Sequence, residues 1–279
     1  MLLVKTIREL QNSLNDSREF GAIGFVPTMG ALHRGHISLV KQAVLENQTV
    51  VVSIFVNPTQ FNDSNDLNKY PRTLETDLKL LENSGCQIVF APNANEVYPE
   101  PDTRKFNFGK LETVMEGKHR PGHFNGVAQV VSKLFDMVKP DKAYFGLKDF
   151  QQLAIIKSMV KQLELPVEII SCPTVREESG LAMSSRNELL TARQRKNASV
   201  LYKTLLMANE QKGQKTVEKL VNWVVETINK NPFLDVEYFE IVDDEQLQQI
   251  TNWNETNTKI GCVALFCGDV RLIDNIVFN

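Results

Sequence analysis

The chain has 279 residues, of which 42% are hydrophobic and 23% are charged, and its formal net charge is −3. This is the composition of an ordinary globular protein that can bury a sizeable core, as one large domain or two smaller ones. The slightly acidic balance gives no basic footprint and excludes non-specific nucleic-acid binding as the main activity.

Cysteine usage and apolar segments bound the compartment. The four cysteines stand in apolar surroundings without C-x-x-C spacing, which predicts reduced packing thiols rather than disulfides or metal ligands. The first ten residues lack the long apolar core and cleavage site of a signal peptide, and no later segment is apolar for the length of a membrane span. We therefore expect a cytoplasmic protein with no membrane partner.

A helical pattern over residues 6–20 is followed by a stretch that predicts a strand, a loop and a helix. Apolar residues around Phe25 suit a buried strand, Pro27 and Gly30 end it, and an apolar pattern of helical period begins near His36. The first turn of such a helix has unpaired N–H groups and the positive end of the helix dipole, which attract an anion such as phosphate. His33 and His36 stand where that anion would lie.

The position of this His-x-Gly-His sequence matters more than the sequence itself, because such short motifs also occur as surface or packing residues. Its glycines allow close backbone approach at the strand-to-helix junction, where open α/β sheets bind ligands. A zinc site made with His119 and His123 is the alternative, but no carboxylate or cysteine falls at familiar ligand spacing nearby. A Walker lysine and a G-x-G-x-x-G run are both absent here, so histidines and backbone amides would hold a nucleotide.

A β-rich run over residues 49–56 predicts a second buried strand, bounded by Asn57. Strands separated by a helix form a right-handed crossover and a parallel pair, so Asn57 and Gln60 are expected at the same sheet edge as His33. Their neutral amides suit substrate hydroxyl and carboxylate oxygens, and their alternative role is to cap the end of the strand. A helix over residues 73–83 and a strand over 87–91 predict a second crossover.

Residues 92–121 are rich in proline, glycine and charge and predict an excursion from the sheet, with a short strand near Phe106 and Phe108. The run from Lys118 to Phe124 carries four potentially cationic groups before a helix over residues 125–138. It is either a solvated face or, with the helix terminus, a second anion site.

A strand over residues 143–145, the turn from Gly146 to Asp149 and a further helix repeat the strand, loop and helix order, and residues 167–171 predict a last parallel strand. The polar loop of residues 173–187 is expected to be a movable lid. Two helical patterns, over residues 191–210 and 216–230, then precede three strand patterns, over 236–242, 259–266 and 271–277. We expect an α/β fold with a Rossmann-like domain of residues 1–174 and a smaller C-terminal α+β lid domain of residues 175–279.

Six motifs stand in order between residues 24 and 187. They are Pro27-Thr28-Met29-Gly30-Ala31-Leu32-His33-x-Gly-His36, Val56-Asn57-Pro58-Thr59-Gln60-Phe61, Tyr70-Pro71-Arg72, Arg120-Pro121-Gly122-His123-Phe124, Lys148-Asp149-Phe150-Gln151-Gln152 and Ser184-Ser185-Arg186-Asn187. In order and spacing these motifs resemble those of the pantothenate synthetase family, which belongs with the nucleotidyltransferases and class I aminoacyl-tRNA synthetases. The tail matches only in length and strand content.

The resemblance implies roles for individual residues. His36, as proton donor, would be catalytic with His33, Lys148 and Arg186. Pantoate and β-alanine would be bound by Gln60, Gln152 and Asn57, and magnesium would lie near Asp77. Departures from the commoner family pattern occur at Arg34, Leu147 and Met115. The implied ATP contacts are Met29, Gly30, Ala31, Leu32, His33, Arg34, Gly35, His36, Gly146, Leu147, Lys148, Asp149, Val175, Met183, Ser184, Ser185 and Arg186.

The implied reaction is the ATP-dependent condensation of pantoate with β-alanine through pantoyl adenylate, which gives pantothenate, AMP and pyrophosphate, in a homodimer that uses magnesium. Attack of a carboxylate on the α-phosphorus demands positive groups around the phosphate oxygens, which the histidines, Lys148 and Arg186 would supply. Two alternatives stay open. One is a nucleotidyltransferase that leaves AMP or CMP on its product, and the other is a nucleotide-sensing module without turnover.

Overall fold

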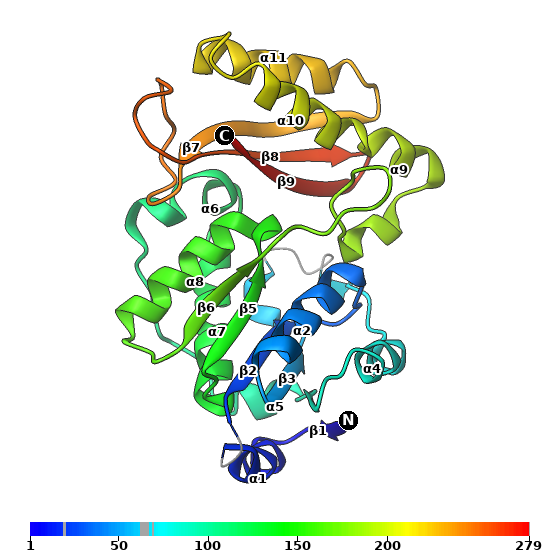
Figure 1. The fold of residues 1–279 in the computed structure, drawn as a ribbon, viewed down its shortest axis with the longest axis vertical. Helices are drawn as coiled ribbons and strands as arrows, with labels where there is room; N and C mark the ends of the chain where they lie inside the picture. The colour runs from blue at the N-terminus through cyan, green and yellow to red at the C-terminus, as the bar shows by residue number, and fades with distance from the viewer. Residues whose placement is uncertain (19–20, 62–66, 69, 279) are drawn as a thin grey trace. The chain divides into compact units, whose positions relative to one another are not determined.

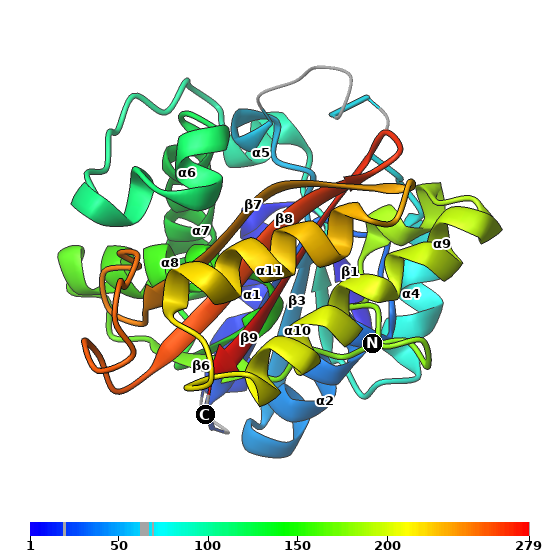
Figure 2. The same cartoon turned by 90° about the horizontal axis from the view of Figure 1, so that it is seen from above.

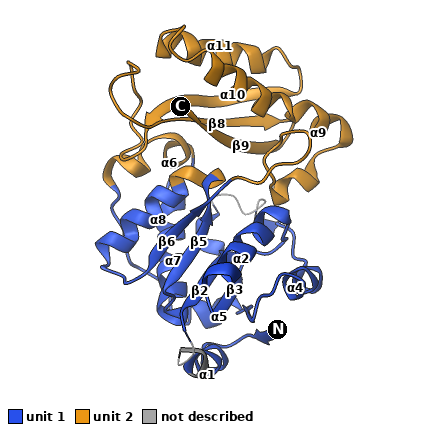
Figure 3. Cartoon of the chain, viewed as in Figure 1, with its two compact units in different colours: residues 1–108, 120–147, 152–173 blue, residues 109–119, 148–151, 174–279 orange. Residues whose placement is uncertain are grey.

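The computed structural model describes residues 1–18, 21–61, 67–68 and 70–278. These residues form two compact units, coloured separately in Figure 3. Unit 1 comprises residues 1–108, 120–147 and 152–173, and unit 2 comprises residues 109–119, 148–151 and 174–279. No helix among the described residues is both long and apolar enough to span a membrane.

Unit 1 is built on a six-stranded sheet in which every pair of neighbouring strands is parallel (Figure 1). Apolar runs form the buried strands β2, β3 and β4, because the central strands of such a sheet are covered on both faces. The expected α/β class with a Rossmann-like parallel sheet is confirmed. In spatial order the strands are β1 (Leu2–Val4), β4 (Ile88–Phe90), β3 (Thr49–Ile54), β2 (Ile23–Thr28), β5 (Lys142–Gly146) and β6 (Glu168–Cys172).

The side chains of consecutive β2 residues point to opposite faces of this sheet. Val26 belongs to a buried cluster with residues of α2 and α4, whereas the ring of Phe25 packs edge-on against Phe135 of α7, with centroids 6.1 Å apart. The alternation of side chains along a strand thus places a different helical layer on each face. The helices with residues in unit 1 are α1 (Ile7–Arg18), α2 (Arg34–Glu46), α4 (Leu74–Glu82), α5 (Ala94–Val97), α7 (His123–Val138) and α8 (Phe150–Gln162).

Unit 1 departs from the sequence-based expectation at two places. The edge strand β1 was not expected, because three residues carry too little pattern to be read. The short strand expected near Phe106 and Phe108 is wrong, since these residues form no strand. The backbone there is satisfied by side chains of α7 instead: Phe106 N donates to Asn125 Oδ1 at 2.9 Å, and Gln129 Nε2 donates to the Arg104 carbonyl at 2.7 Å.

Unit 2 has an antiparallel sheet in the order β7 (Leu234–Asp243), β8 (Lys259–Cys267) and β9 (Val270–Phe278). Helices α10 (Val200–Glu210) and α11 (Val217–Asn229) lie over this sheet, as Figure 2 shows from above. The helix expected over residues 191–210 is divided at Ser199 into α9 (Ala192–Ala198) and α10. Unit 2 also contains the short elements η2 (Gly109–Glu112), α6 (Met115–His119) and η4 (Ser185–Leu189). The short element η3 (Leu147–Asp149) is shared, because its first residue belongs to unit 1 and the other two belong to unit 2.

Two short segments before residue 174 belong to unit 2, although the sequence-based boundary put them in the first domain. In the first segment, the buried Glu116 carboxylate accepts two bonds from the Arg271 guanidinium, at 2.6 and 2.8 Å, and one from the Tyr238 hydroxyl at 2.8 Å. In the second, Gln151 Nε2 donates to the carbonyl of Leu111 at 2.7 Å. These contacts lie far apart in sequence, so no local pattern indicates them.

The prediction of reduced packing thiols is confirmed, because all four cysteines are buried and free. Burial raises the pKa of Cys86 to about 12 and that of Cys172 to about 11. Such thiols stay protonated at neutral pH and act as small apolar side chains.

Candidate active site

The candidate site in unit 1 begins where the strand order reverses. β2 pairs with β3 on one side and with β5 on the other, whereas the chain runs from β2 through β3 to β4 before it returns to β5. Ligands of open α/β sheets bind at such a switch point, beyond the carboxyl ends of the strands. Met29 follows β2 there, and Gly146 ends β5.

His33 and His36 form a reciprocal cap at the start of α2. His33 is the N-cap residue, and its Nδ1 accepts the Gly35 N–H at 3.1 Å, while the His33 N–H donates to His36 Nδ1 at 3.3 Å. The two rings lie 4.0 Å apart between centroids. Because each Nδ1 accepts a hydrogen bond, the neutral imidazole carries its proton on Nε2. The cap therefore makes both Nε2 atoms hydrogen-bond donors.

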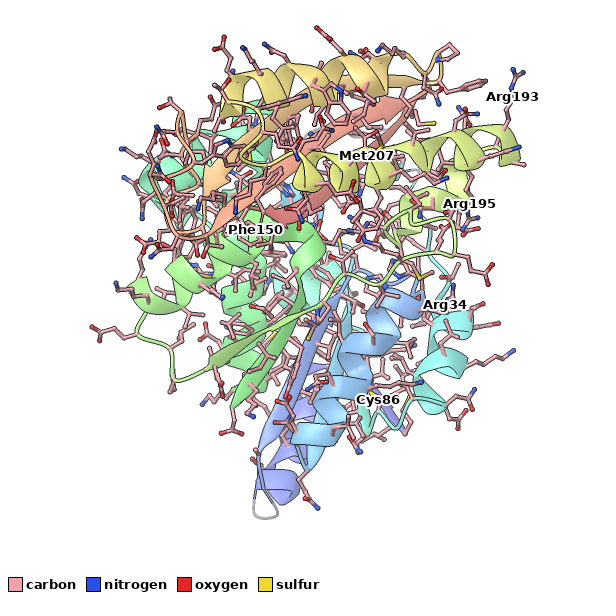
Figure 4. The ribbon with its side chains drawn as sticks, turned by 45° about the horizontal axis from the view of Figure 1, so that its top comes forward. Arg34, Cys86, Phe150, Arg193, Arg195 and Met207 are labelled. Carbon is pink, nitrogen blue, oxygen red and sulfur yellow. The ribbon has the colours of Figure 1, made fainter. Side chains whose placement is uncertain are left out.

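This cap also moves the predicted helix start. The sequence pattern placed it near His36, and α2 in fact begins at Arg34, which is exposed and is labelled in Figure 4. Histidine is not among the usual N-cap residues, so the reciprocal arrangement could not be read from residue types alone.

The loop between β2 and α2 is fixed by Asp77 of α4. Asp77 is 1% exposed, and its two carboxylate oxygens accept the N–H groups of Ala31 and Leu32 at 3.0 and 2.8 Å. Gly30 (φ +82°) and Ala31 (φ +49°) are in the left-handed region, and a Cβ on Gly30 would lie 3.1 Å from Asp77 Oδ2. Asp77 therefore holds a loop conformation that the backbone does not favour by itself.

Gln60 is presented by a short turn that Asn57 organises. Asn57 is 1% exposed, and its Nδ2 donates to Gln60 Oε1 at 3.3 Å and to the Gly126 carbonyl at 3.2 Å. Its Oδ1 accepts the Thr59 N–H at 3.3 Å and the Tyr98 hydroxyl at 3.0 Å. Burial raises the pKa of Tyr98, which keeps this hydroxyl protonated as a donor. The structure thus gives Asn57 the capping role that was its alternative.

The run from Lys118 to Phe124 does not act as one cationic cluster. His119 belongs to unit 2, where its ring stacks on Tyr238 at 5.3 Å between centroids. In unit 1, Arg120 NH1 lies 3.2 Å from His123 Nε2, and His123 Nδ1 lies 2.8 Å from the Gln60 carbonyl. Since arginine only donates, His123 accepts at Nε2 and donates from Nδ1 to Gln60. Arg120 and His123 thus support the backbone of Gln60, and the second anion site stays a prediction.

The zinc alternative finds no geometric basis. Within the described part of the chain, no three or more histidine, cysteine, aspartate or glutamate side chains are grouped so that they could hold a metal ion.

Gly146 and Leu147 belong to unit 1, and the predicted ATP-binding residues of unit 2 lie in two segments. The first is the turn at Lys148, whose Nζ lies 3.7 Å from Asp149 Oδ1. The second is a short hairpin in which Met183 N donates to the Val175 carbonyl at 3.0 Å. After it, Ser184 caps η4, because its Oγ accepts the Arg186 N–H at 3.2 Å.

Charged and amide residues to which the sequence gave no role hold this hairpin and η4. Asn187 is 2% exposed, and its Nδ2 donates to Glu177 Oε1 at 2.9 Å. Arg195 of α9, which is labelled in Figure 4, also binds the Glu177 carboxylate, through Nε and NH2 at 3.0 and 2.8 Å. The hairpin residue Arg176 forms a bidentate pair with the buried Asp274 at 2.6 and 3.0 Å. An adjacent Arg-Glu pair in a polar loop is the only local signal, and it does not name the partners.

The parallel sheet, with a histidine-capped helix at its switch point, defines an α/β protein of the nucleotide-binding type. Comparison with protein families gives the particular family: the model for pantoate-beta-alanine ligase matches residues 2–277. The chain belongs to the pantoate–β-alanine ligase family and is a ligase.

Similar proteins cover its whole length. The pantothenate synthetase of Bacteroides fragilis strain YCH46 is 56% identical over 280 residues, which cover 100% of this chain and 99% of the relative, and that of Phocaeicola vulgatus is 58% identical over 281 residues and the full length of both chains. The crystal structure of pantothenate synthetase from Thermus thermophilus has a TM-score of 0.93 at 45% identity and covers 99% of both chains. The pantoate-beta-alanine ligase of Francisella tularensis, complexed with beta-gamma ATP and beta-alanine, has a TM-score of 0.83 at 38% identity and covers 99% of this chain and 97% of that one.

Proposed function

We propose that this chain joins pantoate to β-alanine to form pantothenate, with ATP activating the pantoate carboxylate as pantoyl adenylate. Its relatives carry the name pantothenate synthetase, and a relative of 38% identity was crystallised with an ATP compound and β-alanine. The observation on this chain that carries the proposal is the His33–His36 cap, which turns two Nε2 donors and a helix N-terminus into one anion site.

In the first step, an oxygen of the pantoate carboxylate bonds to the α-phosphorus while the bond from that phosphorus to the pyrophosphate oxygen breaks. Negative charge builds up on the equatorial and leaving oxygens, where preorganised donors lower the barrier. His33 and His36 each donate a hydrogen bond from Nε2, and His36 is assigned the role of proton donor to the phosphate. The loop backbone from Met29 to Leu32, held by Asp77, is assigned to ATP.

Lys148 and Arg186 supply further positive charge to the phosphates, and Gly146, Leu147 and Asp149 complete the ATP-binding turn. The hairpin of Val175 and Met183, with Ser184 and Ser185, is assigned to the nucleotide as well. Gln60 and the half-buried Gln152 are assigned to pantoate, because neutral amides bond hydroxyl and carboxylate oxygens without bringing another charge to ATP. Asn57 supports Gln60 rather than touching substrate.

In the second step, the neutral amine of β-alanine attacks the mixed anhydride, the new C–N bond forms, and AMP leaves with the electrons of the broken C–O bond. The amine nitrogen gives up one proton to the departing phosphate group or to water, so no strong base is required of the chain. Water is the competing nucleophile, so the segment from Met183 to Arg186 is assigned to its exclusion.

Magnesium is implied by the resemblance, with Asp77 as its expected position. The Asp77 oxygens face the N–H groups of Ala31 and Leu32 and the Thr73 hydroxyl, which donates at 3.2 Å. Both Asp77 oxygens already accept hydrogen bonds, so the positive ends of these donors occupy the places that a cation would need. The carboxylate therefore fits an anchor for the loop and does not fit a magnesium ligand. No step is therefore derived through magnesium. A homodimer stays part of the proposal on the family resemblance alone, and the cytoplasmic location stays the expectation drawn from the sequence.

The test is pantoate-dependent release of pyrophosphate, measured with and without β-alanine. We expect His36→Ala and Lys148→Ala each to lower the single-turnover rate of this release by about 10²-fold, the usual scale for the loss of one preorganised donor. Arg193→Ala is the matched control, because it removes one positive charge from an exposed position on α9 (Figure 4).

An unchanged first step in either variant would remove that residue from the mechanism. Free AMP in the products separates this reaction from that of a nucleotidyltransferase that keeps the nucleotide on its product. Absence of any pantoate-dependent pyrophosphate would favour a nucleotide-sensing module.

A further inference from the structure

We propose that Asn275, on the last strand of unit 2, is a positioning residue that acts on the reaction through Lys148. The proposal rests on the assignment of Lys148 to the ATP phosphates. Asn275 Nδ2 donates to the backbone carbonyl of Lys148 at 2.8 Å, across 127 residues of sequence. Neither residue type nor spacing indicates this contact.

The hydrogen bond from Asn275 constrains the backbone from which the Lys148 side chain extends. A lysine side chain has four rotatable bonds and is held in position only by its contacts, so the place of its backbone sets where the ammonium group can reach. Asp149 Oδ1 is 3.7 Å from Lys148 Nζ and 47% of the Asp149 side chain is exposed, which makes that ion pair weak. The backbone bond to Asn275 is therefore the firmer of these two constraints.

Asn275 is itself held firmly by its neighbours. Its N–H donates to Asp274 Oδ1 at 2.8 Å, and the β9 backbone pairs with β8 at Cys262. Asp274 is 2% exposed and binds Arg176 with two hydrogen bonds, while the Arg176 guanidinium lies 3.5 Å from the centroid of the Tyr202 ring. A buried bidentate pair of this kind fixes orientation as well as distance.

Adjacent residues of β9 thus hold two segments assigned to ATP. Asp274 holds the hairpin that contains Val175 through Arg176, and Asn275 holds the turn at Lys148. The carboxyl-terminal strand is consequently part of what positions the nucleotide-binding residues of unit 2, in addition to closing its sheet.

The test is a double-mutant cycle on the pantoate-dependent release of pyrophosphate by the full chain, with wild type, Asn275→Ala, Lys148→Ala and the double variant. We expect Asn275→Ala alone to lower kcat about tenfold, since misplacement of a catalytic group by a fraction of an ångström has effects of this order. In the Lys148→Ala background the same substitution is expected to change kcat less than about twofold, because the group it positions is already absent.

Val277→Ala is the matched control, because Val277 lies two residues further along the same strand and is 41% exposed. It is expected to keep the wild-type kcat. Melting temperatures of all variants report whether they fold. If Asn275→Ala does not fold, Asn275→Asp serves instead, since it keeps the shape of the side chain and removes the N–H donor, and the same cycle is measured.

A tenfold loss in both backgrounds would overturn the proposal, because a merely structural residue acts independently of Lys148. A wild-type kcat in the single Asn275 variant would overturn it as well. If Lys148→Ala itself keeps the wild-type rate, the assignment of Lys148 fails instead, so the two failures are told apart by which single variant changes the rate.

Discussion

Replacing Asp77 by asparagine is expected to destabilise the chain and slow the reaction without changing its response to magnesium. The carboxylate accepts the N–H groups of Ala31 and Leu32, at 3.0 and 2.8 Å, and it is 1% exposed. The asparagine side chain keeps one acceptor oxygen and turns an NH2 group toward the other N–H donor. One buried donor is then left without its partner.

The cost follows from these contacts. A buried donor that loses its partner costs about 1–3 kcal/mol, and bonds to a charged acceptor are worth about 1.5–3 kcal/mol each. We therefore expect Asp77→Asn to lower the free energy of unfolding by about 2–4 kcal/mol, and Asp77→Ala, which loses both acceptors, by a somewhat larger amount. Both variants stay folded if the whole chain has the usual stability of about 5–15 kcal/mol.

Urea unfolding and pyrophosphate release measure the two consequences. Relaxation of Gly30 and Ala31 from their left-handed conformations would shift the loop that leads into the histidine cap, so the rate should fall with the stability. Glu75→Gln is the matched control, because it removes the same charge from the same helical turn at an exposed position.

A changed magnesium dependence with wild-type stability would refute this reasoning and support a metal contact at Asp77. Equal stability and equal rate of Asp77→Asn and Glu75→Gln would show that the carboxylate does not hold the loop.

Three further predictions concern other parts of the chain. Arg104 lowers the pKa of the buried Asp102 carboxyl below its ordinary 3.8, so the ionised carboxylate stabilises the fold above that pH. When stability to urea is measured at falling pH, the advantage of the wild type over Asp102→Asn should disappear as the pH passes below the pKa of Asp102 in the folded chain. The rise in the pKa of Cys172 from 9.0 to about 11 leaves about a hundredfold less thiolate, so a thiol reagent at pH 8 should label native chain far more slowly than chain in urea, and fast native labelling would contradict this. A Cβ on Gly126 would lie 2.5 Å from the Thr59 carbonyl oxygen, so Gly126→Ala should raise the KM for pantoate about tenfold as it displaces the turn that presents Gln60. A wild-type KM in steady-state kinetics would argue against that last expectation.

The periodicity of apolar residues predicts most of the helices and strands, and particular residues show what it cannot predict. The apolar run around Phe25 and the helical pattern after His36 predict β2 and α2, because strand and helix periods are local properties of the sequence. The cap formed by His33 and His36 was missed, since it depends on two imidazoles turned toward particular backbone N–H groups. The residues 106–108 were given a strand because local propensity does not show whether a partner strand exists.

The residues of the candidate site likewise fall into those that the sequence indicates and those that only the tertiary structure places. The sequence by itself brought His33, His36, Gln60 and Lys148 forward as chemistry-bearing residues, because each follows a strand of a parallel sheet whose carboxyl ends meet at one edge. Tertiary structure alone gave Asp77 its place under the histidine loop.

Tertiary structure likewise joined His123 to Gln60, and Asn275 to Lys148. Such contacts pair groups separated by tens of residues or more, and their energies depend on distances that the order of residues does not contain. The sequence determined which groups can take part in the chemistry, and packing decided which others hold them in place.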